Sequence, residues 1–293
     1  MRLCATILLR FATTIVLGLN LYGFASADTL RSELAYTVTQ IENRLDARVG
    51  IVLLNTATEE TWSHRPHERF LMNSTVKVPI CGAILAQSDK GALSLSEALP
   101  IREADLLSYA PVTSKRVGEN MIISDLCLAA LDMSDNTASN LLLKRLGGPD
   151  AVTNMFRNTG DTVSRLDRFE PDLNTFVPGD PRDTTTPAAM AATLRKLFLE
   201  DALSPSSRVQ LADWTSRGAV TGDLLRVHAP AGWEIFDKSG SGDKTRNIVA
   251  LVKPVNEQPW IVYIFISDAD ADFSTRNAAL KELSAAVMVE IGG

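Results

Sequence analysis

The chain has 293 residues, of which 29 are Lys or Arg and 35 are Asp or Glu, so its formal charge is −6. This length can bury a sizeable core in one or two domains, and a hydrophobic fraction of 45% argues against a disordered chain. The negative charge argues against binding of nucleic acid through bulk electrostatics. Three cysteines are too few for a small disulfide-framework protein.

The N-terminus has the pattern of a secretory signal peptide. Arg2 and Arg10 accompany an apolar stretch, which is followed by a triplet of small residues that ends at Ala27. The apolar stretch is shorter than the roughly 20 residues that a membrane-spanning helix needs. We therefore predict cleavage of residues 1–27 and a mature protein that is periplasmic or secreted, with no membrane attachment.

Hydrophobic periodicity predicts three successive blocks of secondary structure. A helix and two strands come first, a helical block follows, and strands with a final helix close the chain. The helices are expected at 29–45, 75–88, 122–132, 136–146, 149–158, 187–200, 205–216 and 273–290. The strands are expected at 49–54, 58–64, 233–237, 247–253 and 259–267.

This order predicts an α/β fold with an inserted helical domain. We assign residues 28–66 and 218–293 to the α/β domain and residues 67–217 to the helical domain. Within the latter, the stretch 161–186 has three prolines and no clear period, and a loop that long is usually functional or disordered. Small-molecule sites form in clefts between such lobes.

Ser74 and Lys77 lie three residues apart at the start of a predicted helix. Their hydroxyl and amine would share one helix face. A nucleophilic serine needs a base, and Lys77 could serve if burial or positive neighbours lower its pKa. The helix N-terminus would also favour negative charge. Taken alone, this motif is weak, and a simple helix cap is the favoured interpretation of Ser74.

The triplet Ser134-Asp135-Asn136 lies between two predicted helices. Ser134 could relay a proton, while Asn136 could bind a carbonyl group of a substrate. Capping of the second helix is the structural alternative, and both interpretations can hold together.

Two further motifs carry charge. Lys238, Ser239 and Gly240 follow a predicted strand and offer a cation, a hydroxyl and an unobstructed backbone to an anionic substrate. Glu170 lies in the irregular stretch, where it could act as a general base on a water molecule, with Asn174 as a second anchor. A plain loop and a solvated surface acid are the respective alternatives.

Taken together and in this order, the motifs resemble those of the class A serine β-lactamases along essentially the whole mature chain. The matching segments include Ser74-Thr-Val-Lys77, Met133-Ser-Asp-Asn-Thr-Ala138, Arg168-Phe-Glu-Pro-Asp-Leu-Asn174, Arg182-Asp-Thr-Thr-Thr-Pro187 and Asp237-Lys-Ser-Gly-Ser-Gly242. The resemblance implies an α/β (α+β) fold in which an antiparallel sheet is flanked by helices. An all-helical domain would be inserted, and the active site would lie in the cleft between the two.

The resemblance also implies a role for each matched catalytic residue. Ser74 would be acylated by the β-lactam carbonyl, and Lys77 and Glu170 would share the role of base in that step. Glu170, with Asn174, would activate the water that removes the acyl group. Ser134 would pass a proton towards the lactam nitrogen.

The substrate-binding positions implied by the resemblance are Tyr109, Asn136, Asn174, Lys238, Ser239, Gly240 and Ser241. Asn136 would hold the side-chain amide of the substrate, and Lys238 and Ser239 would bind its carboxylate. The backbone N–H groups of Ser74 and Ser241 would form the oxyanion hole.

An arginine near Lys238 is a further expectation from the resemblance. Some members of the family supply it from before the strand, which would be Arg226, and others from the next strand, which would be Arg246. Both arginines are present in this chain, and we favour Arg246.

Two pairs of residues bear on stability. Cys81 and Cys127 would remain after signal cleavage, as a disulfide or as buried thiols, and they match positions that are bridged in one branch of the family. Arg168 and Asp183 match the ion pair that closes the Ω-shaped loop of the family, here 168–183.

No cofactor is expected, and no metal site, because His64 and His67 lack a third ligand. The expected partners are β-lactam substrates and inhibitors, with no nucleic acid, and the protein is expected to be a monomer. A penicillin-binding D,D-peptidase is the alternative function, and the spacing of Glu170 and Asn174 argues against it. The complete set of motifs argues against a non-catalytic binding protein.

Overall fold

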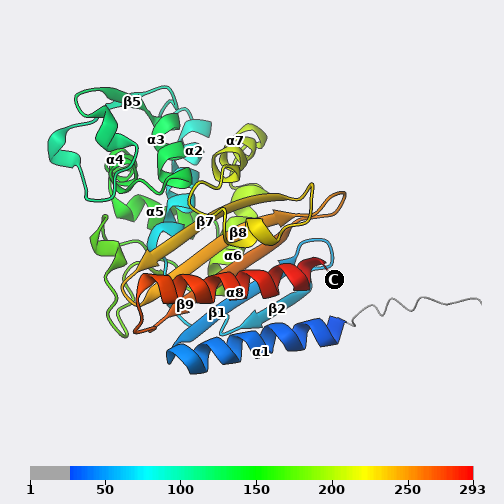
Figure 1. The fold of residues 1–293 in the computed structure, drawn as a ribbon. Helices are drawn as coiled ribbons and strands as arrows, with labels where there is room; N and C mark the ends of the chain where they lie inside the picture. Colours follow the sequence, from blue (N-terminus) through cyan, green and yellow to red (C-terminus); the bar gives the residue numbers. More distant parts are fainter. Residues whose placement is uncertain (1–26, 293) are drawn as a thin grey trace, which may run out of the picture.

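A five-stranded antiparallel sheet forms the centre of the fold in the computed structural model, which describes residues 27–292 (Figure 1). The strand order is β2-β1-β9-β8-β7, so β7 lies at an edge. The strands are β1 (Arg48–Asn55), β2 (Thr61–His64), β7 (Glu234–Gly242), β8 (Thr245–Lys253) and β9 (Trp260–Ser267). Strands from both ends of the chain meet in one antiparallel sheet, which confirms the predicted fold class.

The two faces of the sheet are covered by different helices. Alternate residues of a strand point to opposite faces, so Ile264 packs with the terminal helices and its neighbour Phe265 packs with the helical block. The terminal helices α1 (Ala27–Leu45) and α8 (Phe273–Gly292) lie side by side on one face (Figure 1). Burial on both faces explains why the segment 259–267 is almost continuously hydrophobic.

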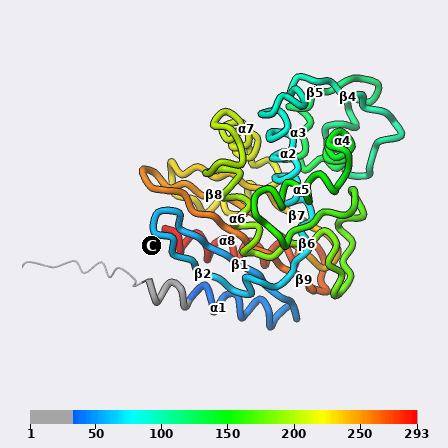
Figure 2. The backbone as a smooth tube through the Cα atoms, turned by 180° about the vertical axis from the view of Figure 1, so that it is seen from behind, coloured from blue at the N-terminus to red at the C-terminus, as the bar shows by residue number. Residues whose placement is uncertain are grey.

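The opposite face is covered by α6 (Pro187–Phe198), which contacts β1 and β9 (Figure 2). The other helices of this block are α2 (Lys77–Asp89), α3 (Ile123–Asp132), α4 (Asn136–Leu146), α5 (Pro149–Asn158) and α7 (Pro205–Ser216). Helix α2 is central, because it contacts every other helix of the block. A helix in that position is expected to be apolar all round, so the buried Lys77 is an exception that needs a functional explanation.

Short elements connect these helices and strands. Two small sheets pair β3 (Phe70–Leu71) with β6 (Thr184–Thr185) and β4 (Ala98–Pro100) with β5 (Asn120–Ile122). The 3₁₀ turns are η1 (Asn73–Val76), η2 (Glu103–Asp105), η3 (Thr113–Arg116), η4 (Asp172–Asn174) and η5 (Leu225–His228). Elements of two to four residues show no measurable period, so periodicity did not predict them.

The predicted helices and strands agree with the structure to within a few residues, with two differences that matter for the site. Strand β7 continues to Gly242 because it pairs with β8 along its whole length, so the segment 238–240 is part of a strand. The predicted helix 75–88 begins as the η1 turn and becomes α-helical at Lys77. The division of the chain at residues 67 and 217 stays a prediction.

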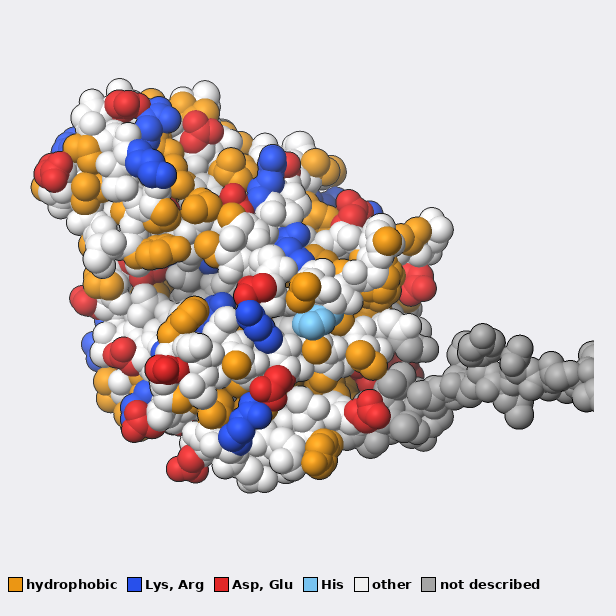
Figure 3. Space-filling view, in the orientation of Figure 1, with side chains coloured by type: hydrophobic (Ala, Val, Ile, Leu, Met, Phe, Trp, Pro, Cys, Tyr) orange, Lys and Arg blue, Asp and Glu red, His pale blue; other side chains and the backbone are white. Residues whose placement is uncertain are grey.

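Acidic and basic side chains are interspersed on the face shown in Figure 3. None of the helices in the described part of the chain is both long and apolar enough to cross a membrane. The predicted signal peptide, residues 1–27, lies outside the described residues apart from Ala27.

Candidate active site

The predicted motifs meet in one cleft beside β7, with a volume of about 370 Å³. Its lining residues are Ser74, Tyr109, Ser134, Asn136, Asn174, Val220, Ser239, Gly240, Ser241, Arg246 and Phe273. Two other hollows have volumes of about 400 and 810 Å³, but none of the predicted site residues lines them. Volume alone therefore does not identify the site, whereas the convergence of polar side chains does.

Ser74 stands in the η1 turn, against which β7 packs closely. A Cβ atom on Gly240 would lie 3.1 Å from the backbone nitrogen of Ser74. No side chain caps η1 or α2, and the Oγ atom of Ser74 instead donates to Oε1 of Glu170 across 3.5 Å. The structural alternative for Ser74 is therefore wrong, because its hydroxyl faces a carboxylate.

Lys77 is fully buried next to that carboxylate. Its Nζ atom lies 3.1 Å from Oε1 of Glu170 and donates to Oδ1 of Asn136 across 2.6 Å. Burial lowers the pKa of Lys77, and the negative charge of Glu170 opposes this shift. An amine with a lowered pKa beside a carboxylate can take part in proton transfer as well as in charge pairing.

Ser134 lies between two lysines. Its Oγ atom is 3.3 Å from Nζ of Lys77 and 3.0 Å from Nζ of Lys238. Both ammonium groups are donors, so the hydrogen of the hydroxyl is available for a third group. Burial lowers the pKa of Lys238 strongly, and the positive charges of Lys77 and Arg246 lower it further.

Asp135, the middle residue of the triplet, has the structural role. Its carboxylate accepts from the backbone nitrogen of Ala138 across 2.9 Å and thereby caps α4. It also accepts from the backbone nitrogen of Thr113 across 2.9 Å. Because Asp135 caps the helix, the flanking side chains of Ser134 and Asn136 remain available to the cleft.

Glu170 is buried and held in place by two asparagines. Asn174 donates from Nδ2 to Oε2 of Glu170 across 2.5 Å. Asn140 accepts from the backbone nitrogen of Glu170 across 2.9 Å and donates to its backbone oxygen across 2.8 Å. The exposed surface acid considered as an alternative is therefore wrong, since only 3% of Glu170 is accessible.

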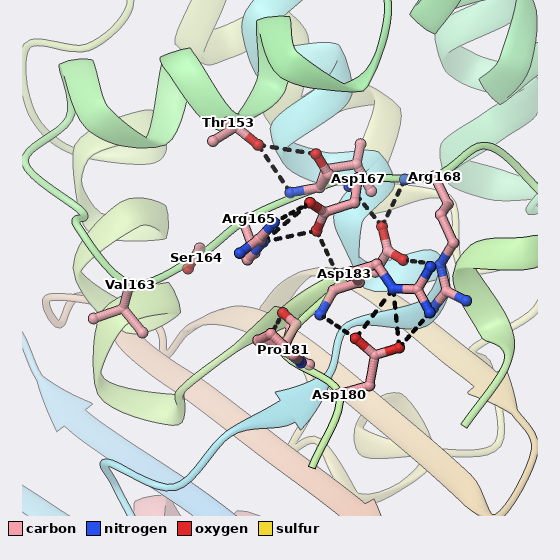
Figure 4. A network of polar contacts seen from close by, with 12 residues as sticks. Thr153, Val163, Ser164, Arg165, Asp167, Arg168, Asp180, Pro181 and Asp183 are labelled. Carbon is pink, nitrogen blue, oxygen red and sulfur yellow. Dashed lines mark hydrogen bonds and ion pairs between the residues drawn. The ribbon is translucent and has the colours of Figure 1, made fainter. Parts of the chain in front are cut away.

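A network of polar contacts holds the loop that carries Glu170 (Figure 4). The predicted ion pair is present, with Arg168 donating from Nε to Oδ2 of Asp183. The other oxygen of Asp183 accepts from the backbone nitrogens of Asp167 and Arg168 at 2.7 and 2.9 Å. Asp167 accepts in return from the backbone nitrogen of Asp183 at 3.0 Å and pairs with Arg165. The two ends of the loop are thus joined by reciprocal bonds.

The two candidate arginines occupy different places. Arg246 lines the cleft, where it donates to the backbone oxygen of Gly240 and to Oδ1 of Asn277, both across 3.0 Å. Arg226 instead pairs with the buried Asp237 at 2.8 Å and does not line the cleft. The geometry therefore favours Arg246 over Arg226 as the arginine near the substrate carboxylate, and the choice stays a prediction. Burial lowers the pKa of Arg246 to about 10.

Comparisons with known proteins agree with this geometry. A model of the beta-lactamase enzyme family matches residues 33–291. A β-lactamase of Rhodobacter capsulatus is 57% identical over 291 residues, which cover 99% of each chain. The solved structure of a class A β-lactamase from the last common ancestor of Gram-negative bacteria (GNCA4) is 45% identical, with a TM-score of 0.85 over 89% of this chain and 99% of that chain. The chain belongs to the class A β-lactamases.

A solved β-lactamase from Xanthomonas campestris pv. campestris is also similar to this β-lactamase. It is 41% identical, with a TM-score of 0.86, and the match covers 90% of this chain and 99% of that chain. The similarity extends over nearly the whole described chain, so it includes the cleft and the loop that carries Glu170 as well as the sheet.

The predicted disulfide is not present in the structure of this β-lactamase. Cys81 and Cys127 are free thiols, although α2 and α3 bring them together, with Sγ of Cys81 at 3.9 Å from the backbone oxygen of Cys127. Both side chains are fully buried. Burial and the neighbouring Cys81 raise the pKa of Cys127, which favours its protonated thiol form.

Sequence reasoning assigned no role to four residues that shape the site of this β-lactamase. Asn73 and Asn140 bond to the loop that carries Glu170, and Asn73 lies in the η1 turn itself. Asn277 accepts a hydrogen bond from Arg246. Phe273 lines the cleft with its ring 5.3 Å from the guanidinium of Arg246. Only Asn140 had a local signal, because it lies four residues after Asn136 on the same helix.

Metal coordination has no visible basis in the described part of this β-lactamase, where no three His, Cys, Asp or Glu side chains gather as a metal site. The groups in and beside the cleft are the hydroxyls of four serines and Tyr109, two lysine amines, the guanidinium of Arg246, the carboxylate of Glu170 and side-chain amides. Such a set can transfer protons and bind an anionic group, and it offers none of the soft or tetrahedral ligand sets that zinc uses.

Proposed function

We propose that this class A β-lactamase hydrolyses the β-lactam amide of penicillins and of some cephalosporins through an acyl-enzyme on Ser74, and so confers β-lactam resistance. The observation that carries the proposal is the contact of one Glu170 oxygen with both Ser74 and Lys77. Oε1 lies 3.5 Å from Oγ of Ser74 and 3.1 Å from Nζ of Lys77. A nucleophile that faces one candidate base, which is itself paired with a second, is an arrangement suited to covalent catalysis.

In acylation, Oγ of Ser74 bonds to the lactam carbonyl carbon and gives its proton to the pair formed by Glu170 and Lys77. The carbon–nitrogen bond then breaks. The lactam nitrogen takes a proton from Ser134, whose hydroxyl is replenished through the adjacent ammonium of Lys77 or Lys238. Donation of two lysines to one oxygen favours this outward transfer, because it stabilises the serine oxygen as its proton leaves.

In deacylation, a water molecule gives a proton to Glu170 while its oxygen bonds to the acyl carbon. The bond from that carbon to Oγ of Ser74 breaks, and the proton returns to Ser74. The anchoring of Glu170 by Asn174 at 2.5 Å supports this step. A D,D-peptidase of penicillin-binding type would acylate in the same way, but would lack an efficient base for the second step.

The binding of the substrate carboxylate rests on the edge strand. Lys238 and Ser239 are adjacent on β7, and the guanidinium of Arg246 bonds to the neighbouring Gly240. We expect the carboxylate to lie beside these groups, because two cations and a hydroxyl on the paired strands β7 and β8 recognise an anion well. The backbone nitrogens of Ser74 and Ser241 would then face the lactam carbonyl.

The test is a pair of substitutions. Glu170→Ala should trap an acyl-enzyme on a penicillin, seen by intact-protein mass spectrometry, and Ser74→Ala should abolish hydrolysis of a chromogenic cephalosporin. Glu257→Ala, at an exposed position in the β8–β9 turn, is the matched control and should turn over normally. Full activity of Ser74→Ala would remove Ser74 as the nucleophile. A persistent adduct on the unaltered enzyme would favour the peptidase alternative.

We also propose that the enzyme is exported through cleavage of residues 1–27 and acts as a monomer in the periplasm or outside the cell. The support is the N-terminal sequence pattern and a chain whose fold includes its own complete cleft. N-terminal sequencing of the exported protein should begin at Asp28. A mature protein that retains the first residues, or a dimer by sedimentation, would contradict this proposal.

A further inference from the structure

Asn73, the residue before the nucleophile, has an unusual backbone and a completely buried side chain. Its φ angle is +49°, in the left-handed region that asparagine tolerates better than most residues. None of its surface is accessible. A buried amide needs hydrogen-bond partners for both its donor and its acceptor end.

The side chain of Asn73 connects β8 to the loop that carries Glu170. Its Oδ1 atom accepts from Oγ1 of Thr245 and from Nδ2 of Asn247, both across 2.9 Å. Its Nδ2 atom donates to Oδ1 of Asn174 across 3.1 Å. Asn174 then donates from Nδ2 to Oε2 of Glu170 across 2.5 Å. Four side chains thus form a continuous path of hydrogen bonds from a rigid strand to the carboxylate.

Each hydrogen bond on this path is donated from the side of β8 and accepted on the side of Glu170. The Glu170 carboxylate can only accept, so Asn174 must turn its NH₂ group towards it and its oxygen away. That oxygen needs a donor, which Asn73 supplies. The orientation of Asn73 is in turn fixed by two donors on β8, and Asn247 is itself fixed by donation to the backbone oxygen of Leu71 across 2.8 Å. Rotation of either amide by 180° would place like groups together in a buried site.

The end of β7 leaves this pair of asparagines little room to relax. A Cβ atom on Gly242 would lie 2.3 Å from Nδ2 of Asn73 and 2.6 Å from the backbone oxygen of Asn174. The backbone nitrogen of Asp243 also donates to that same oxygen across 3.3 Å. The amides are therefore held by bonds on one side and by close packing on the other.

We propose that Asn73 is a positioning residue for deacylation: it sets the direction of the Asn174 amide and thereby the place of the Glu170 carboxylate. This inference rests on the proposed acyl-enzyme mechanism. Asn73 does not touch the reacting atoms in this role, and it acts only through Asn174. The turn that carries Ser74 has supports apart from the Asn73 side chain, since Asn247 donates to the backbone oxygens of Leu71 and Met72 and Thr75 donates to that of Met72. We therefore expect the acylation step to depend on Asn73 less than the deacylation step does.

Two substitutions separate this role from a purely structural one. Asn73→Asp keeps the shape but places an acceptor against Oδ1 of Asn174, which favours rotation of that amide away from its correct direction. Asn73→Gly removes the side chain and suits the positive φ angle, so it guards against a variant that fails to fold. Thr245→Val is the matched control, because it removes one of the two donors to Asn73 and leaves Asn247 in place.

The measurement is rapid-quench kinetics with a penicillin, with the acylated fraction read by mass spectrometry. We expect Asn73→Asp to keep a full acylation burst and to lose steady-state turnover by on the order of 100-fold, the usual effect of misplacing a catalytic group. Asn73→Gly should show the same burst with a smaller loss of turnover, and Thr245→Val should lose far less than Asn73→Asp.

Two results would overturn the inference. One is turnover of both Asn73 variants at the normal rate, and the other is an acylation rate that falls as much as turnover does. These outcomes are distinct from failure of the proposed function, which Glu170→Ala tests on its own. If Glu170→Ala traps the acyl-enzyme and the Asn73 variants do not, only the positioning role is wrong.

Discussion

Arg226 and Arg246 provide a double test, because the structure gives them different tasks. Arg246 faces the cleft and is expected to bind the substrate carboxylate. Arg226 bonds to Asp237, whose side chain is completely buried, and to the backbone oxygens of Thr215 and Ser216. Replacement of each arginine by alanine should therefore affect a different measured quantity.

For Arg246→Ala, the loss is one charge-assisted contact to the substrate. Such a contact contributes about 1.5–3 kcal/mol, which corresponds to roughly a 10- to 150-fold fall in kcat/KM. The melting temperature should change less than for Arg226→Ala, since the hydrogen-bond partners of Arg246 are two neutral groups, the backbone oxygen of Gly240 and Oδ1 of Asn277, and no buried carboxylate loses its partner.

For Arg226→Ala, the loss is the partner of a buried carboxylate. Breaking a buried pair costs about 3–5 kcal/mol of unfolding free energy, or about 6–20 °C in melting temperature for a domain of this size. Steady-state kinetics with a penicillin and thermal unfolding by circular dichroism measure the two effects on the same preparations. A large kinetic loss in Arg226→Ala at unchanged melting temperature, with Arg246→Ala unaffected, would refute the reasoning.

Two further predictions follow from contacts beside the cleft. Phe273→Ala removes the ring 5.3 Å from the guanidinium of Arg246 and should raise KM for a penicillin about two- to fivefold, from a cation–π contribution of about 0.5–1 kcal/mol. Phe273→Tyr should restore the original KM. Equal KM values for the unaltered protein and both variants would contradict this prediction. Burial opposes ionisation of Asp167, but bonds from Arg165 and from the Asp183 backbone outweigh it and lower the pKa of Asp167. A lowered pKa in the folded state means that this stabilisation is complete above the unfolded pKa of about 3.9 and is lost as the pH falls through the folded value. The free energy of unfolding, measured with urea from pH 7 down to pH 3, should therefore fall less steeply for Asp167→Asn than for the unaltered protein. Parallel curves of this free energy against pH would contradict the assignment.

The sequence predicted those parts of the site whose geometry is local. Ser74 and Lys77 are one helical turn apart, and the triplet from Ser134 lies between two helices, so their spacing suggested a chemistry that became specific only when the motifs were taken together. Glu170 was placed with them only by the resemblance, because no local pattern shows that a loop nearly 100 residues away folds against α2. The main helices and strands were predicted for the same local reason, since their periods extend over whole elements.

The choice between the two arginines shows why the rest was not predictable. Arg246 pairs with Ser241 across a tight turn from β7 to β8, and both residues line the cleft. A shift of the register by one residue would place Thr245 or Asn247 opposite Ser241 and send Arg246 to the other face. Residues 245–252 of β8 are all buried, so no alternation of polar and apolar side chains marks the register of this strand.

Asn73 illustrates a second limit. Its partners lie 101, 172 and 174 residues away in the sequence, and none of them has a charge or a period that marks it. The role of a buried amide becomes clear only when the partners of both its donor and its acceptor group are known. Its left-handed backbone also goes against local preference, and strained positions of this kind are concentrated at functional sites.

The charge of the cleft differs in sign from the charge of the chain. Lys77, Lys238 and Arg246 are buried at the cleft, and burial lowers the pKa of all three cations. Of the buried carboxylates nearby, Glu170 faces Lys77, whereas Asp135 caps α4 and Asp237 is paired with Arg226. Such a cluster opposes folding, because each cation loses water and repels the others. The carboxylate of a β-lactam would supply the missing negative charge, so the same repulsion that weakens the free protein favours binding of an anion. Net charge therefore describes the surface of this enzyme, whereas the balance of buried charges determines what its cleft can bind.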